Sequence, residues 1–273
     1  MPTSYEQEIL AWRAEMEAAL RSDTGWLTVV GLFWLHEGEN TVGSDEGCDV
    51  LLPQTAPPLL GRIELRDGTA TLHVAPGAPV AVNGEPAASR ALRSDVPGPA
   101  DVVSVDDVSF FLIQRGTRLG VRVRDRNSRA RREFGGRQWF PVREEYRVEA
   151  AFTAYDPPRQ LQVLNVLGEM EEMVGAGYVT FTLQGHPARL EAVGTKGGRL
   201  WFIFRDQTSG RETYPAARFL YAGPPEGGRV TLDFNRAYSP PCAFTDYATC
   251  PLPPPGNNLP LRVEAGELWL GHH

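Results

Sequence analysis

The residues best suited to chemistry lie between positions 205 and 242, where charged, amide, phenol and thiol side chains interrupt apolar segments. Guanidinium groups bind carboxylates and phosphates through paired hydrogen bonds, and neighbouring amide and phenol groups orient a bound molecule. These residue types predict a pocket for a small polar or anionic ligand, which includes hydroxylated molecules. The candidate ligand-binding residues are Arg205, Arg218, Asp233, Asn235, Arg236, Tyr238 and Cys242.

A second interpretation of the same residues is structural. Asp233, Asn235 and Arg236 follow the end of a predicted strand, where the backbone N–H and C=O groups of a buried loop need hydrogen-bond partners. Both interpretations are open at the level of the sequence. The sequence assigns no catalytic residue, and whether the protein is an enzyme is left open.

The predicted pocket has a candidate cover in the long connection over residues 235–258, after which no strand pattern returns until Leu261. A connection longer than about 12–15 residues without regular structure is usually functional or disordered. Tyr238, Phe244 and Tyr247 offer apolar surface for burial, and prolines lower the entropy lost on ordering. We therefore expect a fixed, packed loop that closes the pocket.

An alternative function is a non-catalytic protein-interaction module. The tract Pro251–Pro255 favours an extended polyproline helix, which aromatic grooves recognise, and a β-sandwich in the first half of the chain is a second candidate surface. The tract also fits a rigid wall of the loop.

The cysteines and histidines give no metal or cofactor signature. Cys242 and Cys250 lie eight residues apart with no histidine between them, which does not match the ligand spacing of structural zinc. A reactive thiol at Cys242 needs a cationic neighbour, and Arg236 is the nearest in sequence. The pattern favours buried, inert thiols, and we predict no metal and no cofactor.

Composition limits the partners. The chain of 273 residues has a net charge of -7, and Lys196 is the single lysine among its 27 basic residues. Mild acidity without a basic stripe argues against nucleic acid or an anionic membrane as partner. Neither a secretory leader nor an apolar stretch of membrane-spanning length is evident, so we expect a cytoplasmic protein. The sequence does not indicate an oligomeric state.

The elements that must position these residues form a mostly β protein. Apolar residues at helical spacing predict one amphipathic helix over 5–22. Short segments rich in β-branched residues and bounded by turn residues then predict two sets of strands, separated at Gly135-Gly136. The most apolar of them, Leu200–Phe204, should be a central strand. We predict an N-terminal helix and connecting segment over 1–39, a β-sandwich over 40–134 and an antiparallel β-barrel or sandwich over 135–273.

Short turn motifs give the first module a resemblance. Residues 40–124 are similar to a forkhead-associated β-sandwich through Thr41-Val42-Gly43-Ser44, Cys48–Pro53, Val82-Asn83-Gly84 and Val105–Val108. The resemblance implies phosphothreonine binding by an arginine after the first glycine and by a serine and a histidine in the second loop. Ser44 stands in place of that arginine, and the second loop reads Pro57-Pro58-Leu59-Leu60-Gly61. Because these donors are absent, we expect a degenerate domain that serves as a scaffold.

A further resemblance spans most of the chain. The sequence is similar to bacterial domain-of-unknown-function family 1684 through Gly31–Leu35, Phe204–Gly210, Tyr214–Leu220 and Asp233–Gly266, with the Cys242–Cys250 stretch as a specific signature. The resemblance implies membership and brings no activity or site residues with it.

Overall fold

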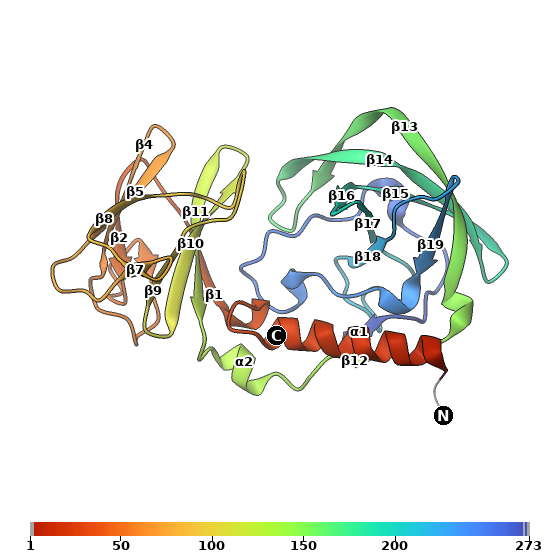
Figure 1. Cartoon of the computed structure of the whole chain (residues 1–273), viewed down its shortest axis with the longest axis horizontal. Coiled ribbons are helices and arrows are strands. Elements are labelled where there is room, and N and C mark those ends of the chain that lie inside the picture. The colour runs from red at the N-terminus through yellow and green to blue at the C-terminus, as the bar shows by residue number, and fades with distance from the viewer. Residues whose placement is uncertain (1–2, 270, 272–273) are drawn as a thin grey trace. The chain divides into compact units, whose positions relative to one another are not determined.

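A computed structural model describes residues 3–269 and 271. The chain forms two compact units, one over 20–134 and the other combining the chain up to Ala19 with the chain from Gly135 onward. The predicted class is confirmed: the protein is mostly β, with one long helix near the N-terminus (Figure 1). Among the described helices, none is both long and apolar enough to span a bilayer.

Helix α1, Ser4–Arg21, matches the predicted helix closely. Its inward face carries Ile9, which is fully buried, and Arg13, whose guanidinium donates to the carbonyl of Phe140 at 3.1 Å. The Trp12 ring lies edge-on to Trp139 at 5.5 Å between centroids. These contacts join helix α1 to Trp139 and Phe140, which are far from it in sequence.

The unit over 20–134 has two sheets whose buried side chains form one core. In the described part of this unit, six strands follow the order β1-β11-β10-β9-β6-β7 and five follow β3-β2-β4-β5-β8. The first sheet contains β1 Val29–Trp34, β6 Ala81–Val82, β7 Glu85–Pro86, β9 Val102–Val105, β10 Val108–Arg115 and β11 Arg118–Asp125. The second contains β2 Gly38–Gly43, β3 Val50–Leu51, β4 Gly61–Arg66, β5 Thr69–Val74 and β8 Ser89–Leu92. The unit also holds the short helices η1 Trp26–Thr28 and α2 Arg129–Glu133.

The second unit has three sheets. Within the described residues, four strands follow the order β15-β14-β13-β19, three follow β16-β17-β18, and β12 pairs with β20. Their bounds are β12 Gln138–Trp139, β13 Arg147–Leu164, β14 Met170–Leu183, β15 His186–Ala192, β16 Gly194–Lys196, β17 Arg199–Phe204, β18 Arg218–Ala222, β19 Arg229–Asp233 and β20 Glu267–Leu268. Four single-turn helices complete the unit: η2 Glu144–Tyr146, η3 Phe234–Arg236, η4 Pro241–Ala243 and η5 Pro255–Asn257.

The apolar stretch predicted as a central strand is β17, the middle strand of its sheet. Phe202 and Phe204 are fully buried there, and they join side chains of the four-stranded sheet in one core. Strand β13 runs over 18 residues and keeps its pairing with β14 across a register shift between Ala154 and Arg159.

The antiparallel hairpin of β13 and β14 arches over the unit (Figure 1). The two backbones approach closely at Gly177, where a Cβ atom would lie 2.3 Å from the carbonyl oxygen of Thr153. Beyond this glycine, side chains alternate: Val179 and Phe181 enter the core, while Thr180 and its even-numbered neighbour Thr182 face solvent. This alternation sets the polar outer face of the sheet.

Candidate functional site

A hollow of about 880 Å³ lies on the four-stranded sheet β15-β14-β13-β19. We call it the sheet-face hollow. Its polar lining residues are Glu149, Thr180, Thr182, Arg189 and Arg229, and its remaining lining residues are Val148, Ala151, Phe181, Pro187 and Ala188.

The pairing register places four of these residues in one row across the sheet. Arg229 of β19 is opposite Ala151 of β13, Ala151 is opposite Thr180 of β14, and Thr180 is opposite Arg189 of β15. Neighbouring strands lie about 4.8 Å apart, so three strand spacings put the two arginine Cα atoms about 14 Å apart. Small side chains therefore form the floor of the hollow and long cationic side chains form its two ends.

The two arginines have different surroundings. The guanidinium of Arg189 lies 3.8 Å from the Tyr178 ring centroid and donates to the Tyr155 hydroxyl at 3.1 Å. Glu191 lies 3.9 Å from it. Arg229 is exposed, and among residues 3–269 and 271 its guanidinium has no acidic partner. Arg189, at one end of the hollow, is thus held by neighbouring side chains, whereas Arg229, at the other end, is available to a ligand.

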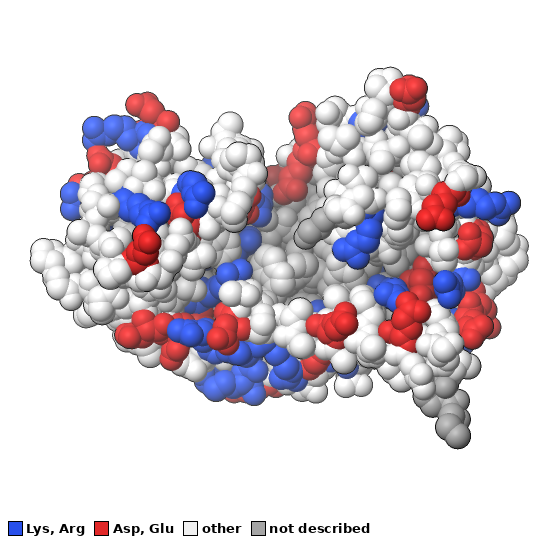
Figure 2. All heavy atoms as spheres, in the orientation of Figure 1, with Lys and Arg blue, Asp and Glu red and all other residues white. Residues whose placement is uncertain are grey.

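The acidic side chain in the lining has a partner of its own, because the Thr231 hydroxyl donates to the Glu149 carboxylate. The hollow therefore combines two guanidinium groups, two threonine hydroxyls and one carboxylate. Acidic and basic side chains are also interspersed on the face of the molecule that Figure 2 shows. The hollow is distinguished by the row of paired residues, which sets an arginine at each end of one floor.

The structure places three of the predicted site residues at the junction with helix α1. Asn235 is fully buried and donates to the backbone carbonyl of Arg143 at 2.8 Å and to the Tyr5 hydroxyl at 3.0 Å. The Tyr5 hydroxyl in turn donates to Asp233 at 2.8 Å. Arg236 pairs with Glu8 and lies 3.5 Å from Asp233. These side chains are occupied with holding the helix and the loop.

The other four predicted site residues are spread over different surroundings. The Arg205 side chain is exposed, whereas Arg218 is buried. Tyr238 packs edge-on against Phe219 at 5.9 Å between centroids, and Cys242 is buried. None of the seven predicted residues is among those that line the sheet-face hollow.

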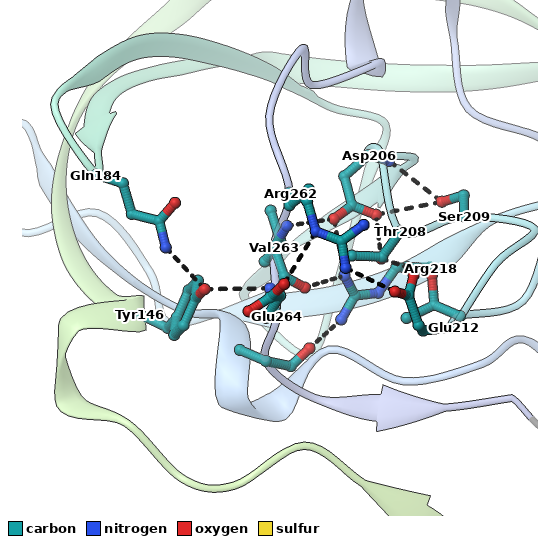
Figure 3. Close-up of polar contacts among 12 residues, drawn as sticks. Tyr146, Gln184, Asp206, Thr208, Ser209, Glu212, Arg218, Arg262, Val263 and Glu264 are labelled. Atoms are coloured by element: carbon teal, nitrogen blue, oxygen red, sulfur yellow. Dashed lines mark hydrogen bonds and ion pairs between the residues drawn. The ribbon is translucent and has the colours of Figure 1, made fainter.

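Arg218 belongs to a buried polar network with Asp206 (Figure 3). A carboxylate oxygen of Asp206 accepts from the backbone N–H of Val263 at 2.5 Å and lies 3.4 Å from the Arg218 guanidinium. The other oxygen accepts from the Thr208 hydroxyl at 2.7 Å. Arg218 also donates to the backbone carbonyls of Val263 and Ala265. The network fixes the segment after Leu261 on β18, which is a structural task.

A second buried ion pair lies nearby in the same unit. A carboxylate oxygen of Glu267 lies 2.5 Å from the Arg137 guanidinium and also accepts from the backbone N–H of Ser239 at 2.7 Å. Burial raises the pKa of Glu267 to about 7, although Arg137 acts in the opposite direction. Desolvation of the charged form outweighs the neighbouring cation here.

The predicted loop over 235–258 contains the single-turn helices η3, η4 and η5. Many of its small side chains are buried, including Ala237, Ala243 and Ala248. The expected burial of Tyr247 is wrong: 39% of this residue is exposed. The Pro251–Pro255 tract is held at its start, because Leu252 donates its N–H to the carbonyl of Leu164 at 2.7 Å.

In the first unit, Ser44 is buried and its hydroxyl donates to the backbone carbonyl of Ala56 at 2.8 Å. Gln54 in turn donates to the backbone carbonyl of Ser44 at 2.9 Å. The position that carries an arginine in the forkhead-associated pattern is therefore used to fix two loops of the unit.

The sequence reasoning missed Thr180, Arg189 and Arg229. The sequence carried a signal for part of this site in Gly185, because glycine readily takes the positive φ that a two-residue hairpin turn of the primed type requires. In the structure Gln184 and Gly185 both have positive φ. That turn alone sets Thr180 opposite Arg189. The sequence carried no comparable local signal for Arg229, because β19 and β13 are far apart along the chain.

Comparison with known proteins identifies the family. Residues 132–268 match the family described as Protein of unknown function (DUF1684), and this chain belongs to that family. An uncharacterized protein from gene locus rrnAC0354 of Haloarcula marismortui, known from a solution NMR structure, is 34% identical. That similarity covers 50% of this chain and 78% of that chain, with a TM-score of 0.43.

A structure from a study of phosphothreonine-dependent FHA domain interactions is 21% identical. That similarity covers 36% of this chain and 96% of the other chain, with a TM-score of 0.24. The comparison with curated proteins gives no match.

Proposed function

We propose that this protein binds a small anionic, hydroxylated molecule in the sheet-face hollow. The observation that carries the proposal is the row Arg229, Ala151, Thr180, Arg189, which sets two guanidinium groups at the ends of a floor of small side chains. A carboxylate or phosphate accepts paired hydrogen bonds from a guanidinium, and such charge-assisted bonds are about twice as strong as neutral ones.

The other groups of the hollow favour a ligand with hydroxyls as well as a charge. Thr180 and Thr182 offer hydroxyl donors and acceptors beside the floor, and the ionised Glu149 carboxylate can accept hydrogen bonds but cannot donate them. An anion without hydroxyl groups offers no hydroxyl donor to Glu149 and no hydroxyl partner to the two threonines. We therefore propose a ligand in which an anionic group meets Arg229 and hydroxyl groups meet Thr180 and Glu149.

The space under the loop over 235–258 is a second possible location for the ligand. Asp233, Asn235 and Arg236 already bond to helix α1 and to the backbone of Arg143, so a ligand under the loop has to displace those contacts. Breaking a buried hydrogen bond leaves a group that costs about 1–3 kcal/mol. A ligand pocket under the loop is therefore the less favoured location.

Binding is tested by isothermal titration of the whole chain with phosphate, citrate and gluconate, which separate charge from hydroxyl content. We expect gluconate or citrate to bind and Arg229→Ala to weaken that binding about tenfold or more, since a hydrogen bond to a charged group contributes about 1.5–3 kcal/mol. Arg211→Ala is the matched control, because Arg211 is exposed in the same unit and lies outside the hollow.

A third variant, Arg236→Ala, locates the ligand. Binding that is lost in Arg236→Ala and kept in Arg229→Ala places the ligand under the loop and contradicts the sheet-face site. Absence of binding for all three anions at millimolar concentration also contradicts the proposal.

A non-catalytic interaction module is the second candidate function. It is favoured by the hairpin of β13 and β14, whose far end exposes Leu164, Leu167, Met170 and Val174 by 42–57%. Exposed apolar side chains gathered on one segment are typical of contact surfaces. Replacing Leu167 and Met170 by serine should then release a bound protein partner without changing the melting temperature; an unchanged partner contradicts this function.

A further inference from the structure

The two cysteines of the second unit lie side by side within the loop over 235–258. Cys242 is in η4, and its backbone N–H donates to the sulfur of Cys250 at 3.3 Å. The two side chains are also hydrogen-bonding partners of each other. The third cysteine, Cys48, belongs to the other unit and forms no part of this arrangement.

The pair is held in place from both sides. The Tyr214 hydroxyl donates to the backbone carbonyl of Cys242 at 2.8 Å, and the backbone carbonyl of Cys250 accepts from the N–H of Val166 at 2.9 Å. The backbone around each sulfur is thus anchored to a different part of the unit. Such fixed neighbours favour reaction between the two sulfurs over reaction with other molecules.

We propose that Cys242 and Cys250 form a reversible disulfide when the protein meets an oxidant of the peroxide class. The loop over 235–258 then carries a redox modification site. Formation of the disulfide does not depend on what the sheet-face hollow binds. The buried thiols predicted from the sequence are present, but their pairing makes them reactive toward each other.

The electrostatics assign an order to the two sulfurs. The pKa of Cys242 is lowered, first by the hydrogen bond from Cys250 and also by Tyr214, against the opposing effect of burial. The thiolate is the nucleophilic form of cysteine. We assign Cys242 as the sulfur that attacks the oxidant and Cys250, whose sulfur lies against the backbone N–H of Cys242, as the resolving sulfur, and the two serine variants below test this order.

The reaction balances with one peroxide. The Cys242 thiolate attacks one oxygen of hydrogen peroxide, so an S–O bond forms, the O–O bond breaks, and the released hydroxide takes a proton to become water. Cys250 then attacks the sulfenic acid sulfur, an S–S bond forms, and the S–O bond breaks with loss of a second water. The two sulfurs together lose two electrons, which reduce the peroxide.

The low exposure of the two cysteines favours a small oxidant. Cys242 is 8% exposed and Cys250 is 5% exposed, so a molecule as small as hydrogen peroxide reaches the pair more readily than a disulfide peptide. We expect oxidation by hydrogen peroxide to be at least tenfold faster than oxidation by glutathione disulfide at equal concentration.

The test uses the full chain, reduced, freed of reductant and treated with hydrogen peroxide. We expect its intact mass to fall by the mass of two hydrogen atoms and to return on addition of a phosphine reductant. Peptide mapping after alkylation in denaturant should show Cys242 joined to Cys250 and Cys48 alkylated. The variant Cys48→Ala should behave in the same way.

Variants separate the two roles. Cys250→Ser should stop at a sulfenic acid on Cys242 that a dimedone probe captures, whereas Cys242→Ser should give neither the disulfide nor the captured adduct at Cys250. If either variant fails to fold, the peptide map of the wild-type chain still shows whether the Cys242–Cys250 disulfide forms. Three alkylated cysteines after peroxide treatment, a cross-link through Cys48, or a sulfinic acid on Cys242 without a disulfide would overturn the proposal.

Discussion

Glu267 and Arg137 form a buried ion pair in which burial opposes ionisation of the carboxyl group. Their side chains are 2% and 6% exposed, and a carboxylate oxygen of Glu267 lies 2.5 Å from the guanidinium. Burial raises the pKa of Glu267 from 4.5 to about 7. The folded protein therefore holds a proton at Glu267 over a pH range in which the unfolded chain has released it.

This relationship predicts a pH dependence of stability with a defined sign. Between pH 4.5 and 7 the folded state binds more protons than the unfolded state, so the free energy of unfolding falls as pH rises. With 1.36 kcal/mol for each pKa unit, the fall attributable to Glu267 is about 3 kcal/mol. Urea unfolding at intervals from pH 4.5 to 8 should show a smaller fall for Glu267→Gln than for the wild type.

The comparison rests on slopes, because Glu267→Gln also leaves Arg137 without its charge partner and lowers stability at every pH. Equal slopes in the two proteins would mean that Glu267 is ionised in the folded state throughout this range.

The buried network around Asp206 predicts a large stability effect without any pH argument. Asp206→Asn leaves Arg218, 1% exposed, without an opposite charge. Breaking a buried pair by removing one partner costs about 3–5 kcal/mol. We expect Asp206→Asn to reduce the free energy of unfolding by that amount in urea titrations.

Arg262→Ala serves as the control for Asp206→Asn. Arg262 pairs with Glu212 and Glu264 in the same unit, but all three side chains are about one-third exposed. Solvent screens the charges of such pairs, so they contribute little to stability. Similar losses in the two variants would contradict the assignment of Asp206 and Arg218 as the stabilising pair.

Features set by neighbouring residues were predictable from the sequence. The spacing of Ile9 and Met16 on one face predicted helix α1, and the uninterrupted apolar stretch at 200–204 predicted a central strand. In both cases the residue types of a short segment alone indicate which of its side chains are buried.

Features set by pairing between distant segments were not predictable. Arg229 reaches Ala151 because β19 pairs with β13, and Tyr5 reaches Asp233 because α1 packs on the C-terminal segment. Polar residues near each other in sequence, such as Asp233 and Cys242, then have different partners. Grouping by sequence proximity therefore predicted one site where the structure forms several separate clusters.

The contacts of Asn235 predict that it stabilises the fold. Its side chain accepts from the backbone N–H of Arg143 at 3.1 Å and donates to the carbonyl of the same residue at 2.8 Å. Asn235→Ala leaves these two part-buried backbone groups unpaired, which places the cost of each in the lower part of the range of about 1–3 kcal/mol for a buried group. We expect a loss of about 2–4 kcal/mol in the free energy of unfolding and faster hydrogen exchange in helix α1.

Asn258→Ala is the matched control for Asn235→Ala, since this asparagine lies in the same loop but is exposed, and its side chain donates to the carbonyl of Pro255 at 3.1 Å. We expect a change within about 0.5 kcal/mol. Unchanged stability and exchange in Asn235→Ala would instead favour a role for Asn235 in ligand binding.

Two glycines with nearly the same backbone conformation differ in how closely other atoms pack against them. Gly266 and Gly185 have φ values of +81° and +80°, so alanine is strained at both positions. The left-handed conformation alone costs a non-glycine residue about 1–2 kcal/mol. At Gly266 a Cβ atom would in addition lie 2.3 Å from the carbonyl oxygen of Ala237, whereas at Gly185 it meets open space.

We therefore expect Gly185→Ala to lower the free energy of unfolding by about 1–2 kcal/mol and Gly266→Ala to lower it by at least about 2 kcal/mol more, because the backbone must move to relieve the contact. That movement also disturbs the adjacent Glu267, whose carboxylate accepts from Ser239. Equal losses in the two variants, measured in the same urea titration, would show that the segment at Gly266 is free to shift.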